Sequence, residues 1–165
     1  MDGSIRSDKL SPEAAEKILL SLVGSWEGTC TTWFEPGKDP VAAPIRGTIR
    51  QLPGSSFVIY EYQSSMEGED FQGVALYGFN VFSGQFESAW ADAFHMRTNI
   101  MSSVGAAAGS GFSVLGSYQF DPEQPAWGWR TQIEPTGPDG LTITAFNVTP
   151  EGEEFQAVET VYRRG

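Results

Sequence analysis

From Gly24 to the end of the chain, apolar and polar residues alternate with a period of two. Valine, isoleucine, threonine and aromatic residues form short runs, which glycine, proline, aspartate and asparagine separate. A period of two places successive side chains on opposite faces of a β-strand, so the pattern predicts an all-β fold for this part of the chain. The predicted strands span about 25–34, 44–52, 56–64, 70–79, 85–94, 97–104, 111–120, 126–134, 140–149 and 154–163.

Before Gly24 the spacing is helical. Apolar residues recur there at intervals of three and four and form one stripe, which consists of Ala15, Ile18, Leu19, Leu22 and Val23. Ser11 can cap the first turn, and Pro12 suits the first helical position. Gly24 can close the last turn. These signals predict an amphipathic helix at about 12–23.

A meander of this many strands without crossover helices either leaves two exposed edges or closes on itself. We therefore predict an antiparallel up-and-down β-barrel of about ten strands with one N-terminal helix, as a single domain over residues 1–165. A two-sheet sandwich is the alternative. A barrel of about eight to ten strands has room inside for one small ligand. No glycine or proline marks a turn near His95, so the strands at 85–94 and 97–104 could also be one bent strand.

The charge balance excludes several classes of protein. Aspartate and glutamate number 21 against 10 lysines and arginines, for a net charge of −11. Because the basic residues are also scattered, we expect no nucleic-acid partner. An acidic chain without an apolar run of about 20 residues is not expected to insert into a membrane. No secretory signal follows Met1 and Cys30 stands alone, so we expect a cytoplasmic protein. Homo-oligomerisation stays open.

The sequence does not predict a metal or catalytic centre. Metal sites usually take three or four histidine, cysteine or carboxylate ligands, but the chain has one histidine, His95, and one cysteine, Cys30. It has no Gly-x-Ser-x-Gly elbow, and the glycines at 105–111 lack the Lys-Ser/Thr of a phosphate loop. We therefore assign no catalytic residue, no metal and no cofactor.

Asp92 is a polar residue in an otherwise apolar strand. It shares a strand face with Trp90 and Phe94, because residues i and i+2 point the same way. If these aromatic side chains line the lumen, Asp92 is a polar anchor in an apolar pocket. It must then be hydrogen-bonded, paired or protonated, and Arg97, Arg130 or a ligand amine could pair with it. Alternatively, Asp92 faces solvent or caps a turn near His95.

Three further residues are candidates for the same pocket. Glu61 shares a strand face with Phe57 and Ile59, and it faces the lumen if that face does. In the opposite register its neighbours Tyr60 and Tyr62 face the lumen instead. His95 is either a hydrogen-bonded residue at a strand end or an acid–base group. Trp129 either lines the pocket or packs against the helix.

The segment Gly24-Ser25-Trp26-Glu27-Gly28 directly follows the helix, and the last strand ends Val161-Tyr162-Arg163-Arg164. This pairing resembles the calycin barrels, a group that includes lipocalins, fatty-acid-binding proteins and nitrobindins. In lipocalins and related families a Gly-x-Trp opens the first strand, and its tryptophan packs at the closed end of the barrel under an arginine from near the end of the fold. The resemblance implies these roles for Trp26 and for Arg163 or Arg164.

A longer stretch, from about Leu22 to Val104, resembles an uncharacterised bacterial domain family of unknown function with lipocalin-like barrels. The shared pattern is Gly-x-Trp-x-Gly, then an aromatic strand at 57–62, then Trp90-Ala91-Asp92. This resemblance implies a fold and no particular activity. Nitrobindins also begin with Gly-x-Trp-x-Gly and bind haem through a histidine near the C-terminus. His95 lies in mid-chain, so we expect no haem.

Together these observations favour a protein that binds a small, largely apolar molecule in the lumen of a barrel. The candidate ligand-binding residues are Glu61, Trp90, Asp92, His95, Arg97 and Trp129. One alternative is a barrel isomerase or hydrolase in which Asp92 or Glu61 works with His95. Another is a self-associating interaction module whose barrel is filled by its own side chains.

Overall fold

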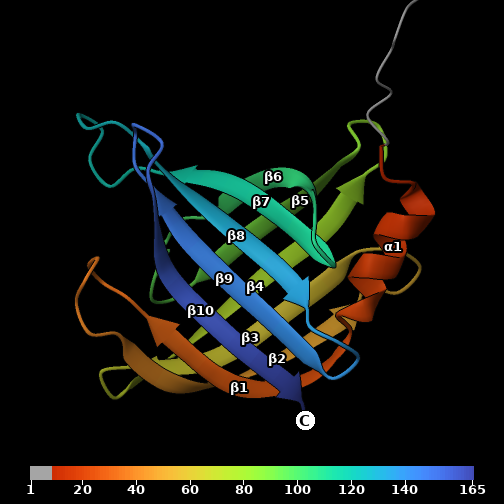
Figure 1. Ribbon diagram of the computed structural model, residues 1–165, viewed down its shortest axis with the longest axis horizontal. Coiled ribbons are helices and arrows are strands. Elements are labelled where there is room, and N and C mark those ends of the chain that lie inside the picture. The colour runs from red at the N-terminus through yellow and green to blue at the C-terminus, as the bar shows by residue number, and fades with distance from the viewer. Residues whose placement is uncertain (1–8) are drawn as a thin grey trace, which may run out of the picture.

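The computed structural model describes residues 9–165, which form a closed antiparallel barrel of ten strands and one helix (Figure 1). The predicted fold class is thereby confirmed, and the two-sheet sandwich is excluded. No helix among these residues is long and apolar enough to cross a bilayer. The elements are α1 (Pro12–Ser21), β1 (Gly24–Thr32), β2 (Val41–Gln51), β3 (Val58–Met66), β4 (Glu69–Asn80), β5 (Gln85–Asp92), β6 (Met101–Ala108), β7 (Gly111–Tyr118), β8 (Trp127–Pro135), β9 (Gly140–Val148) and β10 (Glu154–Arg164).

Each strand pairs with its neighbours in the sequence, and β1 pairs with β10 to close the barrel. The closing pair runs in register from Trp26 opposite Arg164 to Thr32 opposite Val158. Closure leaves no strand edge unpaired in this sheet, which is the physical reason that a meander of this length does not stay open.

The helix closes one end of the barrel. The side chain of Ser11 accepts a hydrogen bond from the Ala14 amide (3.1 Å) and so caps α1. Ala15 and Leu19 are completely buried against the barrel core. The helix was predicted to reach residue 23 but ends at Ser21, with Leu22 as its C-cap.

Trp26 and Arg164 lie beside the C-terminal end of this helix. The Trp26 indole donates to the Leu22 carbonyl (2.9 Å), and the Arg164 guanidinium lies 4.4 Å from the centre of the Trp26 ring. The same guanidinium donates to the carbonyls of Ser21 and Val23. The calycin-like pair is therefore Trp26 with Arg164, and Arg163 takes no part in it.

The half of the barrel next to α1 is filled by aromatic and aliphatic side chains. Phe86 and Phe112 are fully buried there and stack with their ring centres 4.4 Å apart. Tyr77 packs edge-on against Phe112 at 5.5 Å. These side chains pack closely at this end of the barrel.

The chain between β5 and β6 is a turn, so these are two strands and not one bent strand. The Asp92 carboxylate causes the turn, because its Oδ1 accepts hydrogen bonds from the amides of Phe94, His95 and Met96. Residues 97–100, which were predicted to begin a strand, belong to this turn and the link to β6. The turn signal was thus an aspartate rather than a glycine or proline.

A candidate ligand site in the barrel lumen

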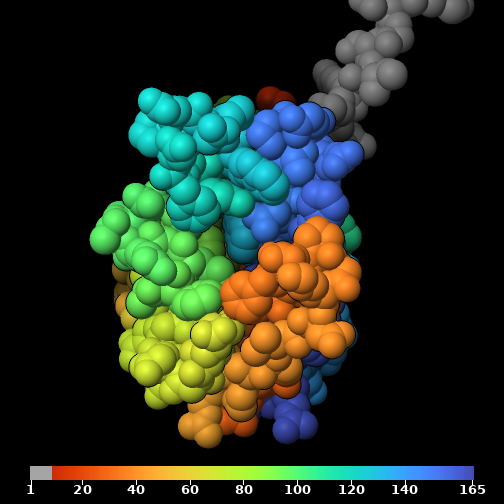
Figure 2. Space-filling model, turned by 90° about the vertical axis from the view of Figure 1, so that its left-hand side faces the viewer, coloured from red at the N-terminus to blue at the C-terminus, as the bar shows by residue number. Residues whose placement is uncertain are grey.

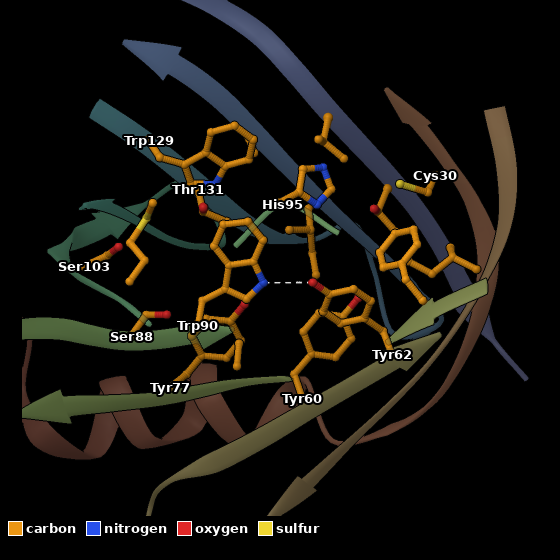
Figure 3. Close-up of a pocket in the computed structure, with 18 residues that line it drawn as sticks. Cys30, Tyr60, Tyr62, Tyr77, Ser88, Trp90, His95, Ser103, Trp129 and Thr131 are labelled. Atoms are coloured by element: carbon orange, nitrogen blue, oxygen red, sulfur yellow. Dashed lines mark hydrogen bonds between the residues drawn. The ribbon is translucent and has the colours of Figure 1, made fainter. Parts of the chain in front are cut away.

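The end of the barrel away from α1 contains a cavity of about 80 Å³. Its wall is mainly aromatic and aliphatic, with a few hydroxyl groups from residues such as Ser88, Ser103 and Thr131 (Figure 3). Among the described residues that line it, none is a lysine, arginine, aspartate or glutamate. The lumen is therefore hollow at this end, and its surface is mainly apolar.

A second pocket of about 180 Å³ adjoins the first on the side away from α1. The two pockets share Trp90, His95, Met101 and Trp129, and the second one continues to Phe120, which is largely exposed. Five loops surround this end of the molecule (Figure 2), namely 33–40, 67–68, 93–100, 119–126 and 149–153. The four side chains that both pockets share thus lie between the inner cavity and the loops.

Trp90 and Trp129 form a flat wall beside this cavity. Their rings stack with centres 5.6 Å apart and an angle of 15° between the planes. The Trp90 indole donates a hydrogen bond to the Tyr62 hydroxyl (2.8 Å), which fixes the orientation of that ring (Figure 3). Trp129 therefore lines the pocket and does not pack against the helix.

Asp92 is buried behind this wall, and its carboxylate is saturated with hydrogen bonds. Besides the three amides at Oδ1, its Oδ2 accepts from the Tyr62 hydroxyl and from His95 Nδ1, each at 2.8 Å. Burial alone would raise the pKa of Asp92, but the hydrogen bonds from His95 and Tyr62 outweigh it and hold that pKa below its ordinary value. Asp92 is consequently an ionised group with no acceptor site left for a ligand.

His95 is the polar group that Asp92 presents to the lumen. Its ring is surrounded by aromatic side chains, with ring centres at 5.8 Å for Trp90, 6.0 Å for Trp129 and 6.1 Å for Phe71. With Nδ1 bonded to Asp92, the other ring nitrogen, Nε2, is buried and has no hydrogen-bond partner within residues 9–165. A buried polar atom without a partner is costly, so it marks a place where a ligand group or a water is expected.

Three tyrosines extend this polar network along the lumen. Tyr60 and Tyr162 share a hydrogen bond of 2.5 Å between their hydroxyls, and Tyr62 joins Trp90 to Asp92. Burial raises the pKa of Tyr60 and of Tyr62 well above the ordinary tyrosine value. Both phenols therefore remain protonated near neutral pH.

The structure brings together four of the six predicted site residues: Trp90, Asp92, His95 and Trp129. The predicted lumen position of Glu61 is wrong, because the side chains of Tyr60 and Tyr62 take the inner face of β3. Glu61 is exposed on the outer face, where its Oε2 lies 3.8 Å from Arg50 Nε. Arg97 is also exposed and does not pair with Asp92. It belongs to the turn after Asp92, where its φ is 55° and its amide donates to the Asp92 carbonyl.

Both readings of Asp92 hold at once, because the same carboxylate is buried behind the lumen and caps the turn near His95. Sequence reasoning missed Tyr62, which connects Trp90 to that carboxylate. The sequence did contain a signal for Tyr62. Tyr60 and Tyr62 share one strand face and Glu61 lies on the other, so either the tyrosines or the glutamate had to face the lumen. Within residues 9–165, no three histidine, cysteine or acidic side chains lie close enough together to hold a metal ion.

A family model described as "Protein of unknown function (DUF1579)" matches residues 11–164, so the predicted resemblance is confirmed over more of the chain than expected. The fold is similar to Rv2717c from M. tuberculosis, at 18% identity and a TM-score of 0.62 over 94% of this chain and 99% of that one. It is also similar to the S-type phycobiliprotein lyase CPES from Guillardia theta, at 13% identity and a TM-score of 0.58 over 91% and 92%. No curated protein sequence matches. Likeness at these identities shows the fold alone.

Proposed function

The chain belongs to the DUF1579 family of proteins of unknown function, and on that premise we propose that it binds a small, largely apolar molecule in the lumen. The observation that carries this proposal is His95 Nε2, which is buried at a hollow, mainly apolar part of the barrel and lacks a partner among the described residues. Most buried polar groups in native proteins are paired, so an unpaired one beside a cavity favours a ligand or a water at that place.

The wall around this atom supports the proposal. Pockets for small molecules are mostly apolar and aromatic with a few fixed polar groups. Here Trp90 and Trp129 supply the apolar surface, and Asp92 fixes the direction of His95. Binding would be driven by burial of apolar ligand surface, at about 25 cal/mol per Å² before the cost of association is subtracted.

A cavity-filling variant tests the proposal. We expect Ala145→Phe, which places a ring into the lumen from β9, to weaken binding of the neutral probe N-phenyl-1-naphthylamine at least about tenfold. The probe is titrated into the protein and its fluorescence increase is followed. Overpacking of this kind typically costs about 1–3 kcal/mol of stability, so folding of the variant is checked by circular dichroism.

The matched control is Ala106→Phe, which adds the same ring to an exposed position of β6. It should bind the probe as the unmodified protein does. Equal binding by Ala145→Phe, Ala106→Phe and the unmodified protein would place the probe outside the lumen and remove the proposed function.

A second candidate function is acid–base catalysis in the same pocket. The observation that favours it is the bond between Asp92 and His95, which leaves Nε2 free to accept a proton from a bound molecule. Glu61 is on the outer surface and cannot contribute.

This candidate is tested with 5-nitrobenzisoxazole, a general substrate for bases in apolar pockets. Nε2 would take the proton from the ring carbon while the N–O bond breaks, which gives 2-cyano-4-nitrophenolate. We expect His95→Ala to slow the elimination at least about 100-fold, the usual contribution of a general base. Similar rates for the variant and the unmodified protein would exclude His95 as a base.

A further inference from the structure

We propose that the lumen is selective for a neutral, flat aromatic molecule that carries an O–H or N–H group, and that this group donates a hydrogen bond to His95 Nε2. This inference rests on the proposed function and specifies the class of ligand. It excludes fatty acids and other carboxylates, which a barrel of this type could otherwise be expected to hold.

The selectivity for a neutral ligand follows from the charges around the cavity. The described lining residues include no lysine or arginine that could pair with a carboxylate or a phosphate. Asp92, the one buried carboxylate within residues 9–165, has both oxygens occupied by protein donors, so it offers nothing to an ammonium group. A buried ligand charge would therefore lose its hydration without finding a partner. The net charge of −11 adds a long-range repulsion of anions.

The need for a donor follows from the tautomer of His95. Its Nδ1 is bonded to a carboxylate, which accepts hydrogen bonds and cannot donate. In the neutral imidazole the proton is therefore on Nδ1, and Nε2 carries a lone pair directed away from Asp92. A ligand O–H or N–H satisfies this lone pair, whereas an ether or a hydrocarbon leaves it unpaired.

The flat shape follows from the walls and the volume. The nearly parallel rings of Trp90 and Trp129 present a planar surface beside His95. The inner cavity of about 80 Å³ and the adjoining pocket of about 180 Å³ are of the order that holds one or two aromatic rings, since a cavity of about 150 Å³ accommodates benzene. Aromatic ligands also gain from edge and stacking contacts with such walls.

The test compares three ligands of nearly the same size and shape. 2-Naphthol carries a donor, naphthalene carries none, and 2-naphthoate carries a negative charge. Each is titrated by calorimetry with the protein in the syringe at pH 8. We expect 2-naphthol to bind about tenfold more tightly than naphthalene, and 2-naphthoate to bind more weakly than 2-naphthol.

The variant His95→Phe keeps a ring in place and removes Nε2. In this variant the affinities for 2-naphthol and naphthalene should differ by less than about twofold, while naphthalene binds nearly as before. The comparison within the unmodified protein stands by itself if the variant fails to fold.

The outcomes separate this inference from the proposed function. Equal affinity for 2-naphthol and naphthalene in the unmodified protein would overturn the requirement for a donor, and tightest binding of 2-naphthoate would overturn the requirement for neutrality. A failure of all three to bind, while Ala145→Phe still blocks N-phenyl-1-naphthylamine, would overturn the ligand class and leave the lumen site standing. If that probe is not blocked either, the proposed function itself is wrong.

Discussion

Asp92→Ala is expected to lower the free energy of unfolding by about 3 kcal/mol, because a buried donor left without its acceptor costs about 1–3 kcal/mol and this substitution leaves several. The substitution removes the acceptor for the Tyr62 hydroxyl, for His95 Nδ1 and for three amides of the turn. Water reaching the turn amides would offset part of this loss. The measurement is chemical denaturation at pH 7, followed by circular dichroism.

The control is Asp70→Ala, which makes the same change of charge at an exposed position of β4. Its effect should stay within about 0.5 kcal/mol. If Asp92→Ala costs no more than Asp70→Ala, the carboxylate does not organise the site.

The stability difference between the unmodified protein and Asp92→Ala is expected to depend on pH. The pKa of Asp92 is lowered in the folded protein, so its ionised form stabilises the fold above the unfolded-state value of about 4. This contribution is lost as the pH falls through the lowered pKa of the folded state. The difference in stability between the unmodified protein and Asp92→Ala should therefore be constant near neutrality and shrink below about pH 4. A difference that grows on acidification would contradict the assignment.

Trp26→Ala is expected to cost about 4 kcal/mol, in the range of buried tryptophan truncations. Only 2% of Trp26 is exposed. Its removal opens a cavity next to α1, leaves the Leu22 carbonyl without its donor and removes the ring under Arg164. Chemical denaturation is again followed by circular dichroism, since fluorescence changes with the number of tryptophans.

Trp127→Ala is the matched control, because 38% of Trp127 is exposed at the start of β8. It should cost less than about 1.5 kcal/mol, since most of the lost contacts are replaced by water. Equal losses for the two variants would show that the closed end of the barrel is not held by Trp26.

The architecture could be predicted because it depends on local patterns. Alternation from Gly24 onward defined the strands, the absence of crossover helices implied a meander, and the unpaired edges of a meander implied closure. The helix start at Pro12 was read from its cap and matches the structure. The turn between β5 and β6 was not predicted from a glycine or proline, because the Asp92 side chain forms it by accepting hydrogen bonds from three backbone amides.

The direction of the β3 side chains could not be predicted, because either face of that strand offered apolar residues to the core. The deciding contacts are distant in sequence: Tyr60 meets Tyr162 across 102 residues, and Tyr62 meets Asp92 across 30. No local pattern contains such pairings. Trp90, Asp92 and His95 were found because they are close in sequence, and a turn folds His95 back onto Asp92.

The most direct measurement is a crystal structure of the protein with N-phenyl-1-naphthylamine. We expect density for the probe across the inner cavity and the adjoining pocket, with one ring beside Trp90 and Trp129, its N–H within hydrogen-bond distance of His95 Nε2, and the remainder extending toward the loops. A lumen packed solid by protein side chains, with the probe seated on the outer face of the barrel, would contradict the account.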